Sequence, residues 1–291
     1  MNGMKRELAE LQQGLEQAGY ICDTSTATVL YLAAALGKPV LVEGPAGVGK
    51  TAIAQAYAGF KNRSLIRLQC YEGIDESKAL YEWNYKKQLL HIQAVAGRDL
   101  EVAEVEREVF SDEFLLPRPL LQAIISPEPC VLLIDEIDKV DMEFEALLLE
   151  LLSEYQVSIP ELGTVSAQSI PLVFITSNAS RELSEALKRR CLYLFLDFPV
   201  PELESRILQL KIPGIQSEMA GQLAAALHSL RLLDLKKTPS IAEAIDWGMA
   251  LTLLGLDTLE PEALLSTLNV LFKYREDLEK ARTAIMNKQE V

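Results

Sequence analysis

Residues 44–51 read GPAGVGKT and match the pattern G-x-x-x-x-G-K-[ST], which restricts the fold of this chain more than any other feature. An apolar run that predicts a buried strand comes directly before them, and a stretch with helical spacing follows. Glycines let backbone N–H groups turn towards phosphate oxygens, and the following helix directs the positive end of its dipole at them. We therefore predict a loop for nucleotide phosphates, made of Gly44, Pro45, Ala46, Gly47, Val48, Gly49, Lys50 and Thr51. The alternative is a glycine-rich turn without a ligand.

The last two residues of this pattern carry its specific chemistry. Lys50 would reach the β- and γ-phosphates, and the Thr51 hydroxyl would hold Mg²⁺. The loop therefore predicts ATP and Mg²⁺ as cofactors, although no motif specific for the adenine base is visible.

Five short apolar runs, each ending in polar or glycine residues, predict buried strands at residues 38–44, 64–70, 130–138, 170–178 and 191–198. Helical stretches separate these runs. Near-continuous apolar strands are typical of a parallel sheet whose two faces are both covered. We predict an α/β fold with a five-stranded parallel sheet between helices, in a domain that spans residues 1–200.

From residue 201 onwards, apolar residues recur at helical spacing over residues 202–212, 217–233, 239–255 and 261–288. Thr238 before Pro239 resembles an N-cap followed by proline at the first helical position, and Gly255 is a plausible helix stop. The sequence therefore predicts a second, all-α domain over residues 201–291.

Two segments of the first domain exceed what an α/β sheet requires. About sixty residues separate the second and third predicted strands, more than one crossover needs. This insert, about residues 71–129, contains YEWNYKKQLLHIQ at 81–93 and a predicted acidic helix at 98–110. Such insertions are either functional devices or inert elaborations. A predicted β-hairpin at about residues 155–170 is the second segment.

Two carboxylates, Asp135 and Glu136, lie at the end of the predicted strand 130–138. Beside a phosphate loop, Asp135 would act through Mg²⁺, and Glu136 would orient and polarise the water that attacks the γ-phosphate. Strand ends often carry acids as solvated caps, so the pair is informative only together with the loop. We interpret Asp138 as a helix N-cap rather than a ligand.

The next predicted strand ends in Asn178. Its amide could hydrogen-bond the γ-phosphate or the attacking water, because neighbouring parallel strands end at the same edge of a sheet. The alternative is a turn residue, since asparagine favours turns.

Lys188-Arg189-Arg190 is the only run of three consecutive cations in a chain whose net charge is −14. Cations at the end of a helix interact favourably with its dipole by up to about 1 kcal/mol, which would explain the run without any function.

Taken in order, the loop 44–51, VLLIDE at 131–136, ITSN at 175–178, ALKRRC at 186–191 and the C-terminal helical stretches resemble an AAA+ ATPase. The long insert and residues 155–178 resemble the MoxR group of that family. Residues 71–93, 114–124 and 236–247 look like the branch encoded beside carbon monoxide dehydrogenase accessory proteins. The resemblance implies a remodelling or chaperone ATPase that acts on a protein client with a von Willebrand factor A domain partner. Members of this branch are thought to mature or activate metalloenzymes and other complexes.

The resemblance also assigns roles to individual residues. Asp135 and Glu136 become the metal-binding and catalytic acids, and Asn178 becomes the first sensor. Arg189 or Arg190 becomes an arginine finger that reaches the nucleotide of a neighbouring subunit. Because a finger needs a neighbour, this implies a closed ring, usually a hexamer.

The chain departs from the family at the second sensor. A serine-proline-arginine-like motif would usually begin the lid helix, whereas this chain has Thr238-Pro239-Ser240. Lys237 is a nearby cation that could substitute. The departure keeps open a nucleotide-dependent binding module that hydrolyses ATP poorly.

A nucleic-acid-linked AAA+ ATPase of the loader type is a further alternative. It would carry a basic stripe, but this acidic chain offers only scattered basic pairs, at 86–87 and 236–237, so nucleic acid is an unlikely partner. No apolar stretch is long enough to span a bilayer, and the first residues lack a signal-peptide pattern. We expect a cytoplasmic protein without membrane insertion.

We expect the insert and the hairpin to transmit the motion driven by ATP hydrolysis to a protein client. In the insert, the candidate residues are Trp83, Tyr85, Lys86 and Lys87. For the two aromatic residues, ordinary packing is an equally good explanation.

Overall fold

The computed structural model describes residues 2–96, 101–256 and 258–287. Within these residues, five parallel strands form one sheet in the order β2-β5-β8-β1-β9. Each strand lies inside one of the five predicted apolar runs, so the predicted α/β architecture is confirmed. The strands are β1 (Val40–Glu43), β2 (Leu65–Gln69), β5 (Val131–Asp135), β8 (Leu172–Ser177) and β9 (Leu192–Phe195).

Two of the three interior strands, β5 and β8, are buried over their full length, which explains why they are apolar without alternation. All neighbours in the sheet are parallel, and Gln69 pairs with Asp135 while Glu43 pairs with Ser177. The carboxyl ends of four strands therefore meet at one edge of the sheet, directly beside the loop that follows β1.

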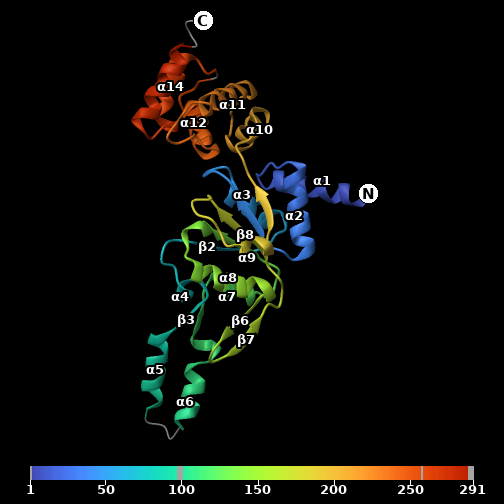
Figure 1. The fold of residues 1–291 in the computed structure, drawn as a ribbon, viewed down its shortest axis with the longest axis vertical. Helices are drawn as coiled ribbons and strands as arrows, with labels where there is room; N and C mark the ends of the chain where they lie inside the picture. The colour runs from blue at the N-terminus through green and yellow to red at the C-terminus, as the bar shows by residue number, and fades with distance from the viewer. Residues whose placement is uncertain (1, 97–100, 257, 288–291) are drawn as a thin grey trace.

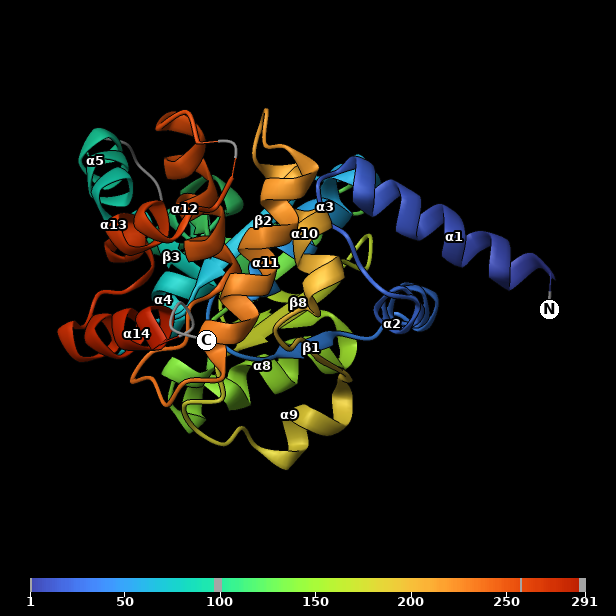
Figure 2. The ribbon, with the colours of Figure 1, turned by 90° about the horizontal axis from the view of Figure 1, so that it is seen from above.

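Helices cover both faces of the sheet (Figures 1 and 2). Alternate strand residues point to opposite faces, so Val42 and Leu133 lie in one core cluster and Leu41 and Leu132 in another. The first face is covered by α1 (Asn2–Gln17), α2 (Thr24–Leu36) and α3 (Lys50–Phe60). The second is covered by α7 (Pro119–Ile124), α8 (Met142–Glu154) and α9 (Glu185–Arg190). None of the helices in the described part of the chain has the length and apolar character needed to cross a membrane.

The predicted insert forms an arm that extends away from the sheet (Figure 1). It comprises α4 (Glu76–Ala79), β3 (Tyr81–Trp83), α5 (Tyr85–Val95), α6 (Val102–Val109), the short 3₁₀ helix η1 (Asp112–Phe114) and β4 (Leu115–Pro117). β3 and β4 pair antiparallel at its base. Residues 98–100 of the predicted acidic helix lie outside the described residues, and α6 accounts for most of the remainder.

Two residues of the insert that were candidates for client contact differ sharply in exposure. Trp83 is buried and packs edge-on against Phe110, with 5.3 Å between ring centroids, so ordinary packing explains it. Tyr85 is 67% exposed at the start of α5.

The predicted hairpin is present as β6 (Gln156–Ile159) and β7 (Gly163–Ser166), which pair antiparallel. Leu162 and Val165 pack against the same core cluster as Phe110 of the arm. The hydroxyl of Tyr155 donates to the Gly37 carbonyl oxygen over 3.0 Å, which ties the base of the hairpin to the end of α2. The hairpin, the arm and the sheet therefore contribute side chains to one core cluster.

In the described part of the chain after the sheet there are five helices: α10 (Pro201–Lys211), α11 (Ser217–Arg231), α12 (Ile241–Leu253), α13 (Pro261–Leu271) and α14 (Arg275–Asn287). They enclose a core cluster of their own around Trp247, whose indole N–H donates to Thr267 Oγ1 over 2.8 Å. The predicted helical stretch 261–288 is divided into α13 and α14, and residue 288 lies outside the described residues. Gly255 follows α12 with φ 71°, as expected of a helix stop.

The start of α12 differs from the prediction. Ser240, not Thr238, is the N-cap, because Ser240 Oγ accepts from the Glu243 N–H while the Glu243 carboxylate accepts from the Ser240 N–H. This reciprocal capping box satisfies two backbone donors and places Pro239 outside the helix.

Arg231 of α11 connects three parts of the C-terminal region. Its guanidinium makes two hydrogen bonds to Glu204 of α10, at 2.8 and 2.7 Å, and donates Nε–H to the Pro239 carbonyl oxygen over 2.9 Å. It also lies 4.6 Å from the centre of the Phe198 ring, in the segment that leads from β9 to α10. Arg231 thereby fixes the position of the residues immediately before α12.

Candidate functional site

The loop between β1 and α3 owes its glycines to backbone conformation and to close neighbours. Gly44, Gly47 and Gly49 have φ angles of 152°, 76° and 101°, which residues with a side chain rarely adopt. A Cβ on Gly44 would lie 2.0 Å from the Leu196 carbonyl oxygen, and one on Gly47 would lie 2.5 Å from Ser240 Cβ and Oγ. The end of β9 and the N-terminus of α12 thus pack directly on the loop.

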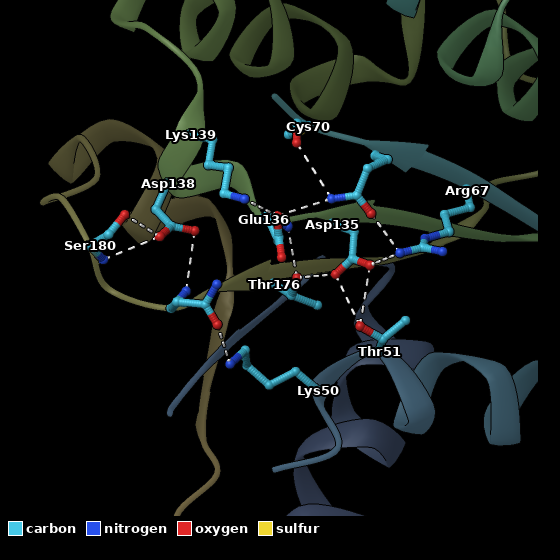
Figure 3. Close-up of polar contacts among 12 residues, drawn as sticks. Lys50, Thr51, Arg67, Cys70, Asp135, Glu136, Asp138, Lys139, Thr176 and Ser180 are labelled. Atoms are coloured by element: carbon cyan, nitrogen blue, oxygen red, sulfur yellow. Dashed lines mark hydrogen bonds and ion pairs between the residues drawn. The ribbon is translucent and has the colours of Figure 1, made fainter. Parts of the chain in front are cut away.

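Lys50 is buried at the N-terminus of α3 (Figure 3), and three oxygen acceptors surround its ammonium. Its ammonium donates to the carbonyl oxygens of Gly44 and Pro45, each over 2.7 Å, and to Asn178 Oδ1 over 2.8 Å. Burial lowers the pKa of Lys50, and the nearby carboxylates oppose this shift. The structure therefore brings the loop lysine and the predicted sensor residue into direct contact.

Thr51 and Asp135, each assigned to Mg²⁺ from the sequence, lie next to each other in the structure. The Thr51 hydroxyl lies 3.1 and 3.2 Å from the two carboxylate oxygens of Asp135, and Thr176 Oγ1 donates to Asp135 Oδ1 over 2.5 Å. A hydroxyl and a carboxylate are hard oxygen ligands of the kind that Mg²⁺ takes together with nucleotide phosphates. The donor set and its place beside the loop thus fit a magnesium ion.

Glu136 directly follows β5 in the left-handed backbone region, with φ 59°. Its N–H donates to Thr176 Oγ1 over 2.9 Å. Its carboxylate oxygen Oε2 accepts from Gln69 Nε2 over 3.1 Å and from Lys139 Nζ over 2.6 Å. Unusual backbone conformations of this kind persist only where surrounding contacts enforce them, and they concentrate at functional sites.

Asp138 does not cap a helix, which corrects the prediction. Asp141 is the N-cap of α8, whereas the Asp138 carboxylate accepts from Ser180 Oγ over 2.5 Å and from the N–H groups of Ser180 and Asn178, each over 3.2 Å. Burial acts to raise the pKa of Asp138, but these hydrogen bonds outweigh it and hold the pKa below its ordinary value. Asp138 therefore positions the segment that carries Asn178.

Sequence reasoning missed the residues that β2 contributes. Arg67 Nη2 donates to Asp135 Oδ2 over 2.6 Å and to Gln69 Oε1 over 2.5 Å (Figure 3). Gln69 in turn contacts Glu136, as described above. The available signal was the predicted strand SLIRLQC: two polar side chains near its carboxyl end must lie at the edge where the neighbouring strand ends in Asp135.

A cavity of about 320 Å³, called the phosphate cavity below, is lined by most of the side chains just described: Lys50, Thr51, Asp135, Glu136, Thr176 and Asn178. An adjacent cavity of about 670 Å³ has part of its wall in common with the first, formed by Gly47, Gly49, Ala52 and Ala242. Its other walls are mainly apolar and come from the segment after α1, from the end of β9 and from the C-terminal helices, for example Tyr20, Leu203, Ile207 and Ile245. A cavity lined by charged side chains that shares a wall with a mainly apolar one has the chemistry expected of a site for nucleotide phosphates and a base.

The C-terminal helices contribute Ala242 to the phosphate cavity and no charged side chain among its described lining residues. Lys237, the cation that could have replaced the second sensor, instead contacts Glu243 Oε1 over 2.6 Å and lines neither cavity. The described lining of this cavity therefore contains Ala242 and no cation from the C-terminal helices, and Lys237 does not substitute for the second sensor within this chain.

Arg189 and Arg190 are exposed at the end of α9 and do not line the phosphate cavity of their own chain. Arg190 donates to Ser153 Oγ over 2.9 Å and to the Ala186 carbonyl oxygen over 3.3 Å. For the guanidinium of Arg189, the described residues offer no hydrogen-bond or ion-pair partner. Lys188 lies 3.5 Å from both Glu182 and Glu185.

Comparison with known proteins agrees with this architecture. A family model described as an AAA domain of the dynein-related subfamily matches residues 39–191, more than half of the chain. Two solved mutants of RuvB from Thermotoga maritima share the fold: each is 19% identical with a TM-score of 0.50, and the match covers 89% of this chain and 70% or 69% of theirs. No curated protein matches the chain in sequence. The chain therefore belongs to the family of AAA domains, in the dynein-related subfamily.

Proposed function

We propose that the chain binds ATP with Mg²⁺ and hydrolyses it to ADP and phosphate. The observation that carries this proposal is the convergence of five side chains from three separate segments on one cavity: Lys50, Thr51, Asp135, Glu136 and Asn178. The apolar cavity that continues from it supports a nucleotide rather than a free anion as the ligand.

Each residue has a defined role in this proposal. Lys50 exchanges its contacts with loop carbonyls for the β- and γ-phosphates, while Thr51 and Asp135 hold Mg²⁺, which neutralises phosphate charge when bound. Glu136 orients the attacking water and accepts its proton. Asn178, already within hydrogen-bond distance of Lys50, orients the γ-phosphate or the water.

Assembly into a ring is the second part of the proposal. Arg189 and Arg190 are exposed and lie outside their own phosphate cavity, which suits a role at the nucleotide of a neighbour. Head-to-tail contacts of this kind close into a ring, and we propose a hexamer. We further propose that residues 1–200 and 201–291 act as separate domains, the second serving as the lid.

We propose that this ATPase is of the MoxR type. It would remodel a protein client together with a von Willebrand factor A domain partner, in the maturation of metalloenzymes or other complexes. The arm supports a role in such contacts, because α5 exposes several apolar side chains far from the sheet: Tyr85, Leu89, Leu90 and Ile92.

A weakly hydrolysing, partner-gated binding module is a second candidate. It is favoured by Ala242 at the phosphate cavity and by the ion pair that engages Glu136 with Lys139. Single-turnover hydrolysis with and without a candidate partner separates the two, because a gated enzyme is slow only when it is alone.

Substitution of Glu136 by Gln tests the assigned chemistry. Glu136→Gln keeps the shape of the side chain but cannot accept a proton, so hydrolysis should fall by about a hundredfold or more. Binding of ADP, measured by calorimetry, should stay within about threefold of wild type because the phosphate contacts do not involve Glu136. Turnover that survives the substitution would exclude Glu136 as the base.

A further inference from the structure

The carboxylate of Asp135 is buried, and donors from this chain already surround it. Its side chain is only 5% exposed. Thr51 lies near both oxygens, Thr176 donates to Oδ1, and the Arg67 guanidinium pairs with Oδ2 over 2.6 Å. A buried carboxylate needs a compensating positive charge, and among the described residues Arg67 is the cation that pairs with this one.

The other cations of the site are held elsewhere. Lys50 is occupied by two loop carbonyls and by Asn178, and Lys139 is paired with Glu136. Arg67 differs from Lys50 because its side chain is 48% exposed, on β2 at the edge of the sheet. Its Nη2 also donates to Gln69 Oε1, so the guanidinium has a second acceptor and access to water. Arg67 can therefore leave Asp135 without being stranded in an apolar environment.

A divalent cation held by Thr51 and Asp135 would stand close to the Arg67 guanidinium. Like charges at such short range repel, and the repulsion is stronger at a partly buried site than in water. The Asp135 Oδ2 acceptor cannot serve both cations equally well. Arg67 and the metal ion are therefore competitors for one carboxylate.

We propose that Arg67 is a displaceable counter-ion of Asp135: it neutralises the carboxylate, gives up Oδ2 when Mg²⁺ binds with the nucleotide, and thereby weakens metal binding. This inference rests on the proposed nucleotide site and deepens it, because it assigns control of metal loading to a residue of β2. It predicts that removal of Arg67 makes the metal bind more tightly, which a residue that merely supports the fold would not do.

The test measures binding of ADP, so that no catalytic step enters. The affinity of the full chain for ADP is measured by calorimetry with excess Mg²⁺ and again with excess EDTA, and the ratio of the two affinities reports metal coupling. In addition, Mn²⁺ is titrated into the protein saturated with ADP and followed by electron paramagnetic resonance. Arg67→Ala should raise the ratio, and tighten Mn²⁺ binding, by at least about threefold.

Three further variants make the result specific. Arg67→Gln removes the charge but keeps a long polar side chain, so it should behave like Arg67→Ala even if the alanine variant folds poorly. Arg67→Lys keeps a cation that can pair with Asp135 and should stay near wild type. Lys61→Ala removes an equal charge from an exposed position at the end of α3 and should leave metal coupling unchanged.

The outcomes separate this inference from the proposed function. An unchanged or smaller ratio in both neutral Arg67 variants would overturn the counter-ion role while leaving the nucleotide site intact. If the wild-type chain failed to bind ADP with or without metal, the proposed function itself would be wrong.

Discussion

Gly47 links the phosphate loop to the C-terminal helices through direct contact with Ser240. Gly47→Ala would add a methyl group 2.5 Å from Ser240 at φ 76°, so both the backbone and α12 must shift. We expect a loss of about 1–3 kcal/mol of stability and at least about a tenfold loss of ADP affinity. Thermal unfolding and calorimetry measure the two effects.

Gly73 provides a matched control for this substitution. It has φ 80° and no atom within 4 Å of an added Cβ, so Gly73→Ala has a similar backbone penalty without the contact. It should lower stability without changing ADP affinity. Equal effects of the two substitutions on ADP binding would show that the contact between the loop and α12 is unimportant.

At the level of single residues, the motifs identified side chains that the structure brings together, but not the hydrogen-bond network around them. Each motif identified one of the two residues Thr51 and Asp135, and the parallel order of β5, β8 and β1 places the Thr51 hydroxyl 3.1 Å from Asp135 Oδ1. The prediction that Asp138 is a helix N-cap was wrong, because its hydrogen-bond donor Ser180 lies 42 positions away in the sequence and no local pattern encodes that contact. Arg67 was missed for the same reason, since its partner belongs to the neighbouring strand.

The C-terminal end of α9 is the element on which the ring proposal depends. Arg189→Ala combined with Arg190→Ala should leave ADP binding unchanged, because neither side chain lines the cavity of its own chain. Hydrolysis should fall at least tenfold if these residues stabilise the transition state at a neighbour's nucleotide. Steady-state phosphate release measures the effect.

Two comparisons sharpen this prediction. Lys188→Ala removes a cation that lies near Glu182 and Glu185 of its own chain, and it should change hydrolysis little. Mixing the double variant with Glu136→Gln should restore part of the activity, because one chain then supplies the arginines and the other the base. No recovery in mixed assemblies would argue against action between subunits.

Element boundaries show where sequence patterns lose information. The five strands were predictable because continuous apolar runs end in polar residues at the sheet edge. The division between α13 and α14 was not, because apolar residues continue at helical spacing across it. The start of α12 was misplaced by two residues, since the proline rule was applied at Pro239 while the capping box of Ser240 and Glu243 decides the helix start.

On the scale of the whole molecule, the apolar cavity lies between the α/β part and the C-terminal helices. Of the two cavities, Ile245 of α12 lines only the apolar one, whereas Ala242 of the same helix lines both. In the proposed complex, the C-terminal helices would therefore contact mainly the base end of the nucleotide, which ATP and ADP share. We expect Ile245→Ala to lower the affinities for ADP and for a non-hydrolysable ATP analogue by the same factor, about three- to tenfold.

Leu253→Ala is the control on the same helix, because Leu253 is 88% exposed and lines neither cavity. Its affinity for both nucleotides should equal that of wild type in calorimetry. If Ile245→Ala lowered the affinity for the ATP analogue but not the affinity for ADP, these helices would instead discriminate the γ-phosphate.

The arm, whose helix α5 exposes apolar side chains, has a consequence for the strength of the proposed client binding. A rotationally symmetric assembly would repeat the arm once per subunit and direct every copy to the same side. A client that touches two arms gains avidity, which can exceed either single affinity by about 10²–10⁴. The apolar surface of one α5 can then stay small enough to keep free subunits from aggregating, while the assembled set still binds its client tightly.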